Sequence, residues 1–205
     1  MAPDYWNKAT RHLSNQCPQM KMLIKRYKGE ALRARGNGFY TLARSVVGQQ
    51  ISVKAADSVW KKIEQAVKPL TPKKLLALPE DELRACGLSK PKAVYLRNVA
   101  EFFLKRDVTA EYWAKHTDEE VMAELVAIKG IGSWTAEMFM IFHLLRPDVF
   151  PVKDLAVLKA VDMHITGKER LKPAEYLALA ARWAPYRTVA SWYLWRSLDP
   201  VPVEY

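Results

Sequence analysis

Hydrophobic residues recur at intervals of three and four along most of this chain, the spacing that places side chains on one face of an α-helix. The stretch from Pro18 to Tyr27 is typical, with Met20, Leu23 and Ile24 at this spacing. No segment shows the sustained alternation of apolar and polar residues that a half-buried β-strand requires. The pattern therefore predicts an all-α protein.

Prolines and short polar residues mark the starts of several predicted helices. Proline is favoured in the first turn of a helix, because its missing N–H would have no helical partner there. On this basis helices begin at Thr71-Pro72, at Pro79-Glu80 and at Ser89-Lys90-Pro91. Further helices are predicted over residues 39–47, 52–67, 173–183 and 187–198.

A pair of helices joined by a glycine turn is predicted over residues 118–145. Thr117 and Glu120 have the spacing of a capping box, which opens the first helix. The run Gly130-Ile131-Gly132 ends that helix, since a tight turn resists residues with a Cβ, and Ser133 is expected to cap the second helix. Backbone N–H groups at such a turn, beside a helix N-terminus, suit a phosphate group.

A carboxylate follows this hairpin at the end of the run Phe150-Pro151-Val152-Lys153-Asp154. Asp154 precedes an apolar stripe of Leu155, Leu158 and Val161, so it is expected at the N-terminus of a helix. The helix dipole there favours the ionised form of the side chain. Two interpretations stay open from the residues alone: a simple helix cap and a catalytic carboxylate.

Charge and composition narrow the choice of partner. The 205 residues carry a formal net charge of +10, which favours a polyanion.

The two cysteines, Cys17 and Cys86, and the 4 histidines show no metal-ligand spacing, so reduced thiols and structural or solvated imidazoles are expected. The longest apolar run, 138–145, is too short to cross a membrane, and the first residues lack the layout of a signal peptide. An intracellular protein is therefore expected.

The hairpin and the carboxylate together resemble the helix-hairpin-helix (HhH-GPD) DNA glycosylase superfamily, most closely its AlkA-like branch of the 3-methyladenine DNA glycosylase II type. The residues that carry the resemblance are Gly130-Ile131-Gly132-Ser133-Trp134-Thr135-Ala136, Pro151-Val152-Lys153-Asp154 and the run from Ala43 to Ala56. The resemblance implies a two-lobed helical bundle, with lobes of about 39–132 and of 1–38 plus 133–205, and an active-site cleft between the lobes. It covers roughly Gly38 to the C-terminal helices, and the chain has no room for the N-terminal β-rich domain of the AlkA-type enzyme.

The resemblance implies that Asp154 is the catalytic residue of a glycosidic-bond hydrolase. Cleavage builds positive charge on the sugar, and a carboxylate beneath the sugar stabilises that charge or deprotonates the attacking water. Alkylation at purine N3 or N7 makes the base cationic, so aromatic faces attract it. The residues at the matching pocket positions are Trp134, Met138 and Trp195. Trp192, on the same last predicted helix as Trp195, is a further candidate for the base pocket, with core packing at least an equal alternative.

Two further positions refine the expected chemistry. Arg196 stands where the family usually has a tyrosine, so that wall of the pocket differs. Trp134 stands where bifunctional glycosylase/lyases place a lysine that forms a Schiff base, which tryptophan cannot do. A monofunctional hydrolase without lyase activity is therefore expected. The iron–sulfur cluster of some relatives is not expected, since the C-terminal segment has no cysteines to hold one.

Contacts to duplex DNA follow from the same resemblance. A base that leaves the stack must be replaced by a wedge, and Gln50 aligns with that wedge, beside Gln49 and Ile51. Contacts to the DNA backbone are expected from Lys129, Gly130, Gly132, Ser133, Thr135 and Lys153. A Na⁺ or K⁺ ion is expected to link a phosphate to the backbone carbonyls of Val126, Ile128 and Ile131.

The expected function is excision of alkylated purines, 3-methyladenine and by extension 7-methylguanine, from double-stranded DNA in base excision repair. A monomer without a required cofactor is expected, in the cytoplasm and nucleoid of a bacterium or the nucleus of a eukaryote. Two alternatives stay open. One is a helix-hairpin-helix module that binds DNA structure or damage without cutting, and the other is a glycosylase for deaminated or mismatched bases.

Overall fold

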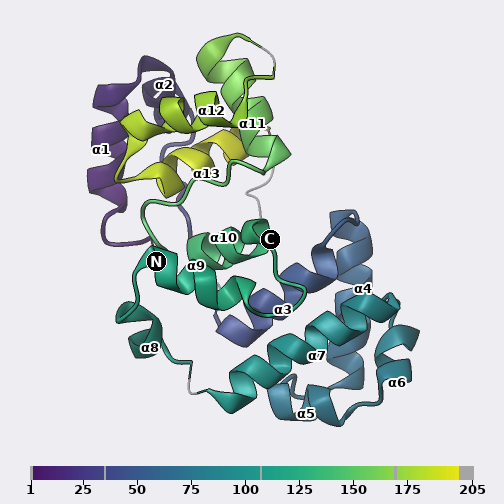
Figure 1. Cartoon of the computed structure of the whole chain (residues 1–205). Helices are drawn as coiled ribbons and strands as arrows, with labels where there is room; N and C mark the ends of the chain where they lie inside the picture. The colour runs from purple at the N-terminus through teal and green to yellow at the C-terminus, as the bar shows by residue number, and fades with distance from the viewer. Residues whose placement is uncertain (1, 35, 107, 169, 199–205) are drawn as a thin grey trace. The chain divides into compact units, whose positions relative to one another are not determined.

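The computed structural model describes residues 2–34, 36–106, 108–168 and 170–198, and within them it contains helices and loops but no β-strand (Figure 1). The prediction of an all-α protein is confirmed. The helices are α1 (Trp6–Gln16), α2 (Pro18–Arg26), α3 (Gly38–Gly48), α4 (Val53–Ala66), α5 (Pro72–Ala77), α6 (Glu80–Ala85), α7 (Lys90–Lys105), α8 (Ala110–Ala114), α9 (Asp118–Val126), α10 (Ser133–Phe142), α11 (Leu155–Val161), α12 (Pro173–Ala180) and α13 (Arg187–Leu198). A π-helical turn, η1 (Asp162–Thr166), follows α11, and a 3-10 turn, η2 (Ala181–Trp183), follows α12.

The helix starts predicted from prolines and capping residues are largely confirmed. Thr71 caps α5 by accepting the backbone N–H of Lys74 at 3.3 Å. The capping box of α9 is complete, because the backbone N–H of Glu120 donates to Thr117 at 3.2 Å and that of Thr117 donates to Glu120 at 2.8 Å. These local bonds satisfy N–H groups that the first turn of a helix leaves without a helical partner.

The predicted cap of α10 is wrong by one residue. Gly132 is the N-cap of this helix, with an extended backbone (φ −91°, ψ 171°), and Ser133 lies in the first turn. No side chain caps α10 from the N-cap position, because glycine has none. The space beside the turn is open, since a Cβ on Gly132 would meet no atom within 4 Å.

Three elements were not predicted from the sequence pattern. Helix α1 buries Trp6, Ala9 and Leu13 on one face, and α8 is a short helix that Thr109 caps. The turn η1 continues α11 with wider π-type bonding and ends at Gly167, whose φ of +64° favours glycine. With 5 residues each, α8 and η1 give too few periodic positions for a pattern to identify them.

The described residues group into two compact units. The terminal unit takes its residues from 1–34 and 145–204, and the central unit takes its residues from 35–144. The expected association of the N-terminal helices with the C-terminal ones is present within the terminal unit. The boundary differs from the expected one at residue 133, because α10 packs on α3 and α9 and so belongs to the central unit. Residues 199–205 of the expected second lobe lie outside the described residues.

The terminal unit is built around α13, which packs against α1, α2 and α11 (Figure 1). Trp6 of α1 meets Trp192 of α13 edge-on, with ring centroids 5.3 Å apart. The ring of Tyr193 lies 5.7 Å from the same Trp6 ring. Large aromatic contacts of this kind bury much area for each residue and fix the position of α13.

The central unit is built around α3, which packs against α4, α7 and α10, while α5 and α6 cover α7 (Figure 1). Phe139 of α10 is buried and contacts Trp113 of α8, with ring centroids 5.6 Å apart. On the side of α4, the indole N–H of Trp60 donates to the Tyr40 hydroxyl at 2.8 Å. The second helix of the hairpin is therefore anchored in a packed core.

Cys17 and Cys86 are both free and buried, and burial raises the pKa of the Cys86 thiol. Among the described residues, no three His, Cys, Asp or Glu side chains gather where they could hold a metal ion. In the same part of the chain, no helix combines the length and apolar character needed to cross a membrane.

Gly130→Ala is expected to lower the free energy of unfolding by about 1–3 kcal/mol, because Gly130 has a φ of +104° and an added Cβ would overlap the Tyr95 ring. Urea denaturation of the variant and the wild type measures this difference. Gly132→Ala is the matched control, since its φ is ordinary and its Cβ would meet nothing within 4 Å. Equal losses of stability in the two variants would contradict the special requirement for glycine at position 130.

Candidate active site and nucleic-acid interface

Asp154 is the only Asp, Glu, Lys or Arg among the described residues that is buried, with 5% of its surface exposed. It is the N-cap of α11, as predicted, and its Oδ1 accepts the backbone N–H of Val157 at 2.9 Å. The same oxygen accepts the indole N–H of Trp195 at 3.0 Å. The backbone N–H of Asp154 donates to the carbonyl of Pro151 at 2.9 Å. Donors from two helices therefore fix the orientation of this carboxylate.

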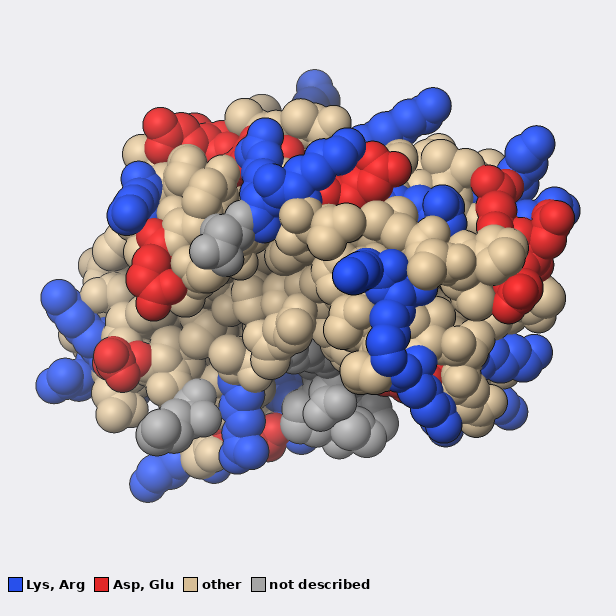
Figure 2. Space-filling view, turned by 90° about the horizontal axis from the view of Figure 1, so that it is seen from below, with Lys and Arg blue, Asp and Glu red and all other residues tan. Residues whose placement is uncertain are grey.

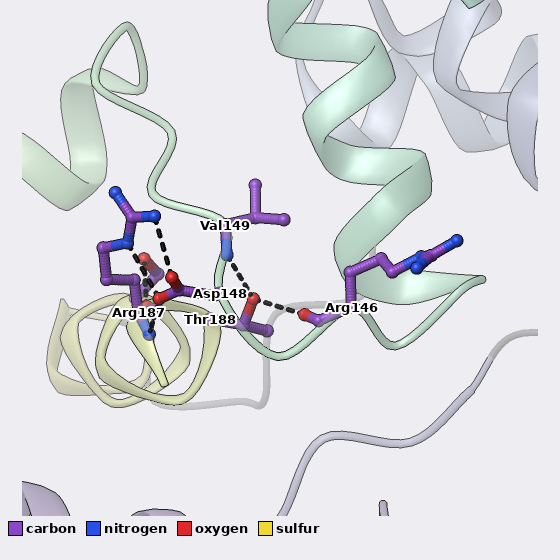
Figure 3. Close-up of polar contacts among 6 residues, drawn as sticks. Arg146, Asp148, Val149, Arg187 and Thr188 are labelled. Carbon is purple, nitrogen blue, oxygen red and sulfur yellow. Dashed lines mark hydrogen bonds and ion pairs between the residues drawn. The ribbon is translucent and has the colours of Figure 1, made fainter. Parts of the chain in front are cut away.

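The segment that leads to Asp154 is fastened to the first turn of α13 (Figure 3). The buried Thr188 hydroxyl donates to the carbonyl of Arg146 at 2.6 Å and accepts the backbone N–H of Val149 at 3.0 Å. The backbone N–H of Thr188 donates to the carbonyl of Pro147 at 3.1 Å. One residue of α13 thus holds three successive parts of the segment.

Asp148 completes this attachment through Arg187 (Figure 3). Its Oδ1 accepts the backbone N–H of Arg187 at 3.1 Å and the Nε at 2.8 Å, and its Oδ2 accepts Nη2 at 2.8 Å. Burial raises the pKa of Asp148, but the hydrogen bonds and charge of Arg187 outweigh burial, so the pKa lies below its ordinary value. With Trp195 farther along the same helix, α13 holds the 146–154 segment at both of its ends.

The predicted pocket residues are divided between the two units, and their environments differ. Trp195 is 1% exposed and bonds directly to Asp154, so the structure places it beside the candidate carboxylate. Trp192 is buried among aromatic rings, which is the core-packing alternative. In the central unit, Met138 is buried within α10, and Trp134 is half-buried in the first turn of that helix.

Arg196 occupies the position at which this chain departs from the family pattern. Its Nε donates to Glu30 Oε2 at 2.6 Å, and its Nη2 donates to Oε1 at 3.2 Å. Its guanidinium also lies 4.6 Å from the centroid of the Tyr27 ring. These contacts give Arg196 a structural role, because they tie α13 to the segment that follows α2.

The turn between α9 and α10 is held from two sides. The Gln49 side-chain amide donates to the carbonyl of Gly130 and to the hydroxyl of Thr135, both at 3.1 Å. The Asn98 amide donates to the carbonyl of Lys129 at 3.0 Å. The side chains of Gln49 and Thr135, predicted to contact DNA, therefore contact each other and support the turn. The Lys129 side chain is exposed.

The loop between α3 and α4, residues 48–52, carries the predicted wedge. Gln50 is exposed and adopts a φ of +58°, which is uncommon for a residue other than glycine. Ile51 is 41% exposed. The loop thus exposes Gln50 and Ile51 to solvent. The preceding residue, Gln49, instead hydrogen-bonds to the hairpin through its side chain.

Lys92 of α7 contacts this loop and was not among the predicted site residues. Its Nζ donates to the carbonyl of Val47 at 2.8 Å and to the carbonyl of Gln49 at 2.6 Å. Burial lowers the pKa of Lys92. The run from Cys86 to Ala93, which contains Lys92, resembles the family in sequence. The sequence does not show, however, that Lys92 bonds to the carbonyl of Gln49, 43 residues away.

The carbonyls predicted to bind a monovalent cation lie at the end of α9 and in the turn. The Ile128 carbonyl accepts the backbone N–H of Ile131 at 2.9 Å, and a carbonyl oxygen has a second lone pair with which it can coordinate a cation. The cation stays a prediction.

Basic side chains are spread over the face of the molecule in Figure 2, interspersed with smaller acidic groups. Lys129 and Lys153, both predicted to contact the DNA backbone, are exposed. The formal net charge of +10 over the whole sequence suits a polyanionic partner.

A glycine hairpin ahead of a helix N-terminus, followed by a buried helix-capping Asp, defines a protein of the helix-hairpin-helix glycosylase class. Residues 43–185 match the family described as HhH-GPD superfamily base excision DNA repair protein, and the chain belongs to that superfamily.

Similarity to individual members covers between 74% and 97% of the chain. It is 32% identical over 198 residues to DNA-3-methyladenine glycosylase 1 of Schizosaccharomyces pombe, covering 93% of this chain and 86% of that protein. It is 26% identical over 163 residues to DNA-3-methyladenine glycosylase 2 of Escherichia coli, covering 74% of this chain and 55% of that protein. The solved structure of the Schizosaccharomyces pombe 3-methyladenine DNA glycosylase in complex with abasic DNA matches with a TM-score of 0.83 and 29% identity, covering 97% of this chain and 100% of that one.

Asp148→Asn is expected to lower the free energy of unfolding at neutral pH by about 1–2 kcal/mol. The substitution removes a bidentate, partly exposed ion pair with Arg187. The folded-state pKa of Asp148 lies below 3.8, so the stability that the ionised pair contributes is present above this value. It is lost as the pH falls through the folded-state pKa. The advantage of the wild type over the variant should therefore shrink on acidification.

Urea unfolding at neutral pH and in steps down to about pH 2 checks this expectation. Asp81→Asn is the control, since Asp81 forms an exposed pair with Arg84. A wild-type advantage that stays constant over this pH range would refute the linkage.

Proposed function

We propose that this protein is a monofunctional DNA glycosylase that extrudes alkylated purines from duplex DNA and hydrolyses their glycosidic bond. The observation that carries the proposal is the buried carboxylate of Asp154 at the start of α11, which accepts two hydrogen bonds, in a chain of the HhH-GPD superfamily. The names of relatives support an alkylated substrate, because they are called 3-methyladenine glycosylases in a yeast and in a bacterium.

Asp154 has the chemical character that this reaction needs. The transition state carries positive charge on the sugar, and a carboxylate held in place can stabilise it without reorganising. The same carboxylate can accept a proton from the attacking water. The bonds from Val157 and Trp195 hold one oxygen of Asp154 and set the plane of the carboxylate in either role.

Among the described residues, one buried candidate carboxylate and nearby aromatic rings support the proposed substrate class. Alkylation at N3 or N7 gives the base a positive charge and makes it a better leaving group, so little general-acid assistance is needed. An aromatic face attracts such a cationic base, and Trp134, half-buried at the start of α10, is the candidate ring. Trp134 has no amine, so the reaction ends at an abasic site without strand cleavage by this residue.

DNA binding uses features of the central unit. The N-terminus of α10 and the exposed Lys129 contact phosphates, and neither contact distinguishes one base from another. Gln50 and Ile51 fill the space that the extruded base leaves. The protein acts as a monomer, without a required cofactor, in the compartment that holds the DNA.

Asp154→Asn is expected to reduce release of 3-methyladenine from methylated duplex DNA by about 100-fold or more under single-turnover conditions. Asparagine keeps an oxygen that can accept from Val157 and Trp195, so the free energy of unfolding should change little. Chromatography of the released bases separates 3-methyladenine from 7-methylguanine. Asp81→Asn, a change at an exposed carboxylate, should release both bases as the wild type does.

Normal release by Asp154→Asn would refute the role of this carboxylate. No release by the wild type, with DNA binding intact, would instead favour a non-catalytic binding module or a different lesion. A panel of duplexes with deaminated and mismatched bases separates these two.

Lys129→Ala is expected to weaken binding to undamaged duplex DNA equally for different sequences. The slope of log affinity against log salt concentration should fall by about one unit, because one phosphate contact is lost. Fluorescence anisotropy at several salt concentrations measures the slope. A slope equal to that of the wild type would show that Lys129 makes no phosphate contact.

A further inference from the structure

The loop of residues 48–52 is bonded to two other elements of the central unit. Gln49 donates to Gly130 and Thr135 of the hairpin, and Lys92 of α7 donates to the carbonyls of Val47 and Gln49. The four distances lie between 2.6 and 3.1 Å. The loop that carries the predicted wedge residues is thus connected by side chains to the hairpin turn between α9 and α10.

Lys92 holds the backbone on either side of Gly48. A lysine ammonium has three donors, and two of them are directed at carbonyls that end α3. Such carbonyls lack helical partners, so a charged donor satisfies them strongly. The loop therefore begins from a fixed position.

Gln49 sets the direction of the loop after that point. Its side chain turns toward the hairpin, and the next residue, Gln50, takes up a left-handed conformation with an exposed side chain. A residue other than glycine holds such a conformation when its surroundings impose it, and such positions are frequent at functional sites. The bonds at Gln49 and Lys92 are the surroundings that impose it here.

We propose that Gln49 and Lys92 are positioning residues that couple the wedge loop to the hairpin, so that Gln50 and Ile51 are already held ready to enter the base stack when the hairpin binds a phosphate. This inference rests on the proposed function. A wedge held in advance loses less conformational entropy when it enters the stack, which lowers the barrier to base extrusion. Phosphate contact at the hairpin does not need the wedge, so the two steps can be separated by experiment.

The variants Gln49→Met and Lys92→Met remove the donor groups and keep side chains of similar length. Two matched controls are Gln65→Met in α4 and Lys90→Met in α7, which alter exposed residues of the same types. Thermal unfolding of each protein establishes that it is folded. Because both positions hold one loop, the double variant should lose less than the sum of the single losses, when the losses are expressed as free energies.

Two readouts distinguish positioning from a general structural role. The first is anisotropy with undamaged duplex, which reports the phosphate grip. The second is the fluorescence of 2-aminopurine beside an uncleavable abasic-site analogue, which rises when the stack opens, together with the single-turnover rate of 3-methyladenine release. Each Met variant at Gln49 or Lys92 should lose about tenfold in release rate and most of the fluorescence rise, with affinity for undamaged duplex within about twofold of wild type.

Wild-type fluorescence and release in both variants, at saturating enzyme, would overturn the coupling. Equal losses in the Gln65 and Lys90 controls would overturn it as well. Absence of base release by the wild type would refute the proposed function instead, and the 2-aminopurine signal of the variants would still decide whether Gln49 and Lys92 position the loop.

Discussion

The candidate chemistry of this protein depends on holding a buried carboxylate in one orientation inside a helical unit. A buried charge is costly unless hydrogen bonds replace the water that it loses. Asp154 meets this condition with one backbone donor from the helix that it caps and one indole donor from α13. Since α13 also holds the 146–149 segment through Arg187 and Thr188, a single helix determines both where the carboxylate lies and how it is oriented.

The central unit uses buried and half-buried polar side chains in a related way. Gln49, Thr135 and Lys92 bond to backbone groups or to one another, and this leaves their exposed neighbours to face solvent. In the loop of residues 48–52, Gln49 and Lys92 hold the backbone in place, whereas Gln50 and Ile51 are exposed to solvent.

Much of the fold could be predicted from the sequence, because helix periodicity and capping are local. The capping box at Thr117 and the N-cap position of Asp154 are examples. Roles that depend on contacts distant in sequence could not be predicted. Gln49 was assigned to DNA because it lies beside the wedge, yet its partners are 81 and 86 residues away. The sequence predicts Trp195 at a pocket wall, but it does not indicate that the Trp195 indole bonds to a carboxylate 41 residues away.

A hairpin that grips phosphates meets the same groups at every nucleotide, so it cannot by itself select a damaged base. Selection must come from a step at which bases differ, and the proposed reaction has two. Extrusion is easier for a base that pairs poorly, and hydrolysis is easier for a base that already carries positive charge. With one candidate carboxylate and a tryptophan rather than a lysine at position 134, an activated base of this kind is the favoured substrate. The residues at positions 134 and 154 thus favour the same chemistry, with a cationic leaving group.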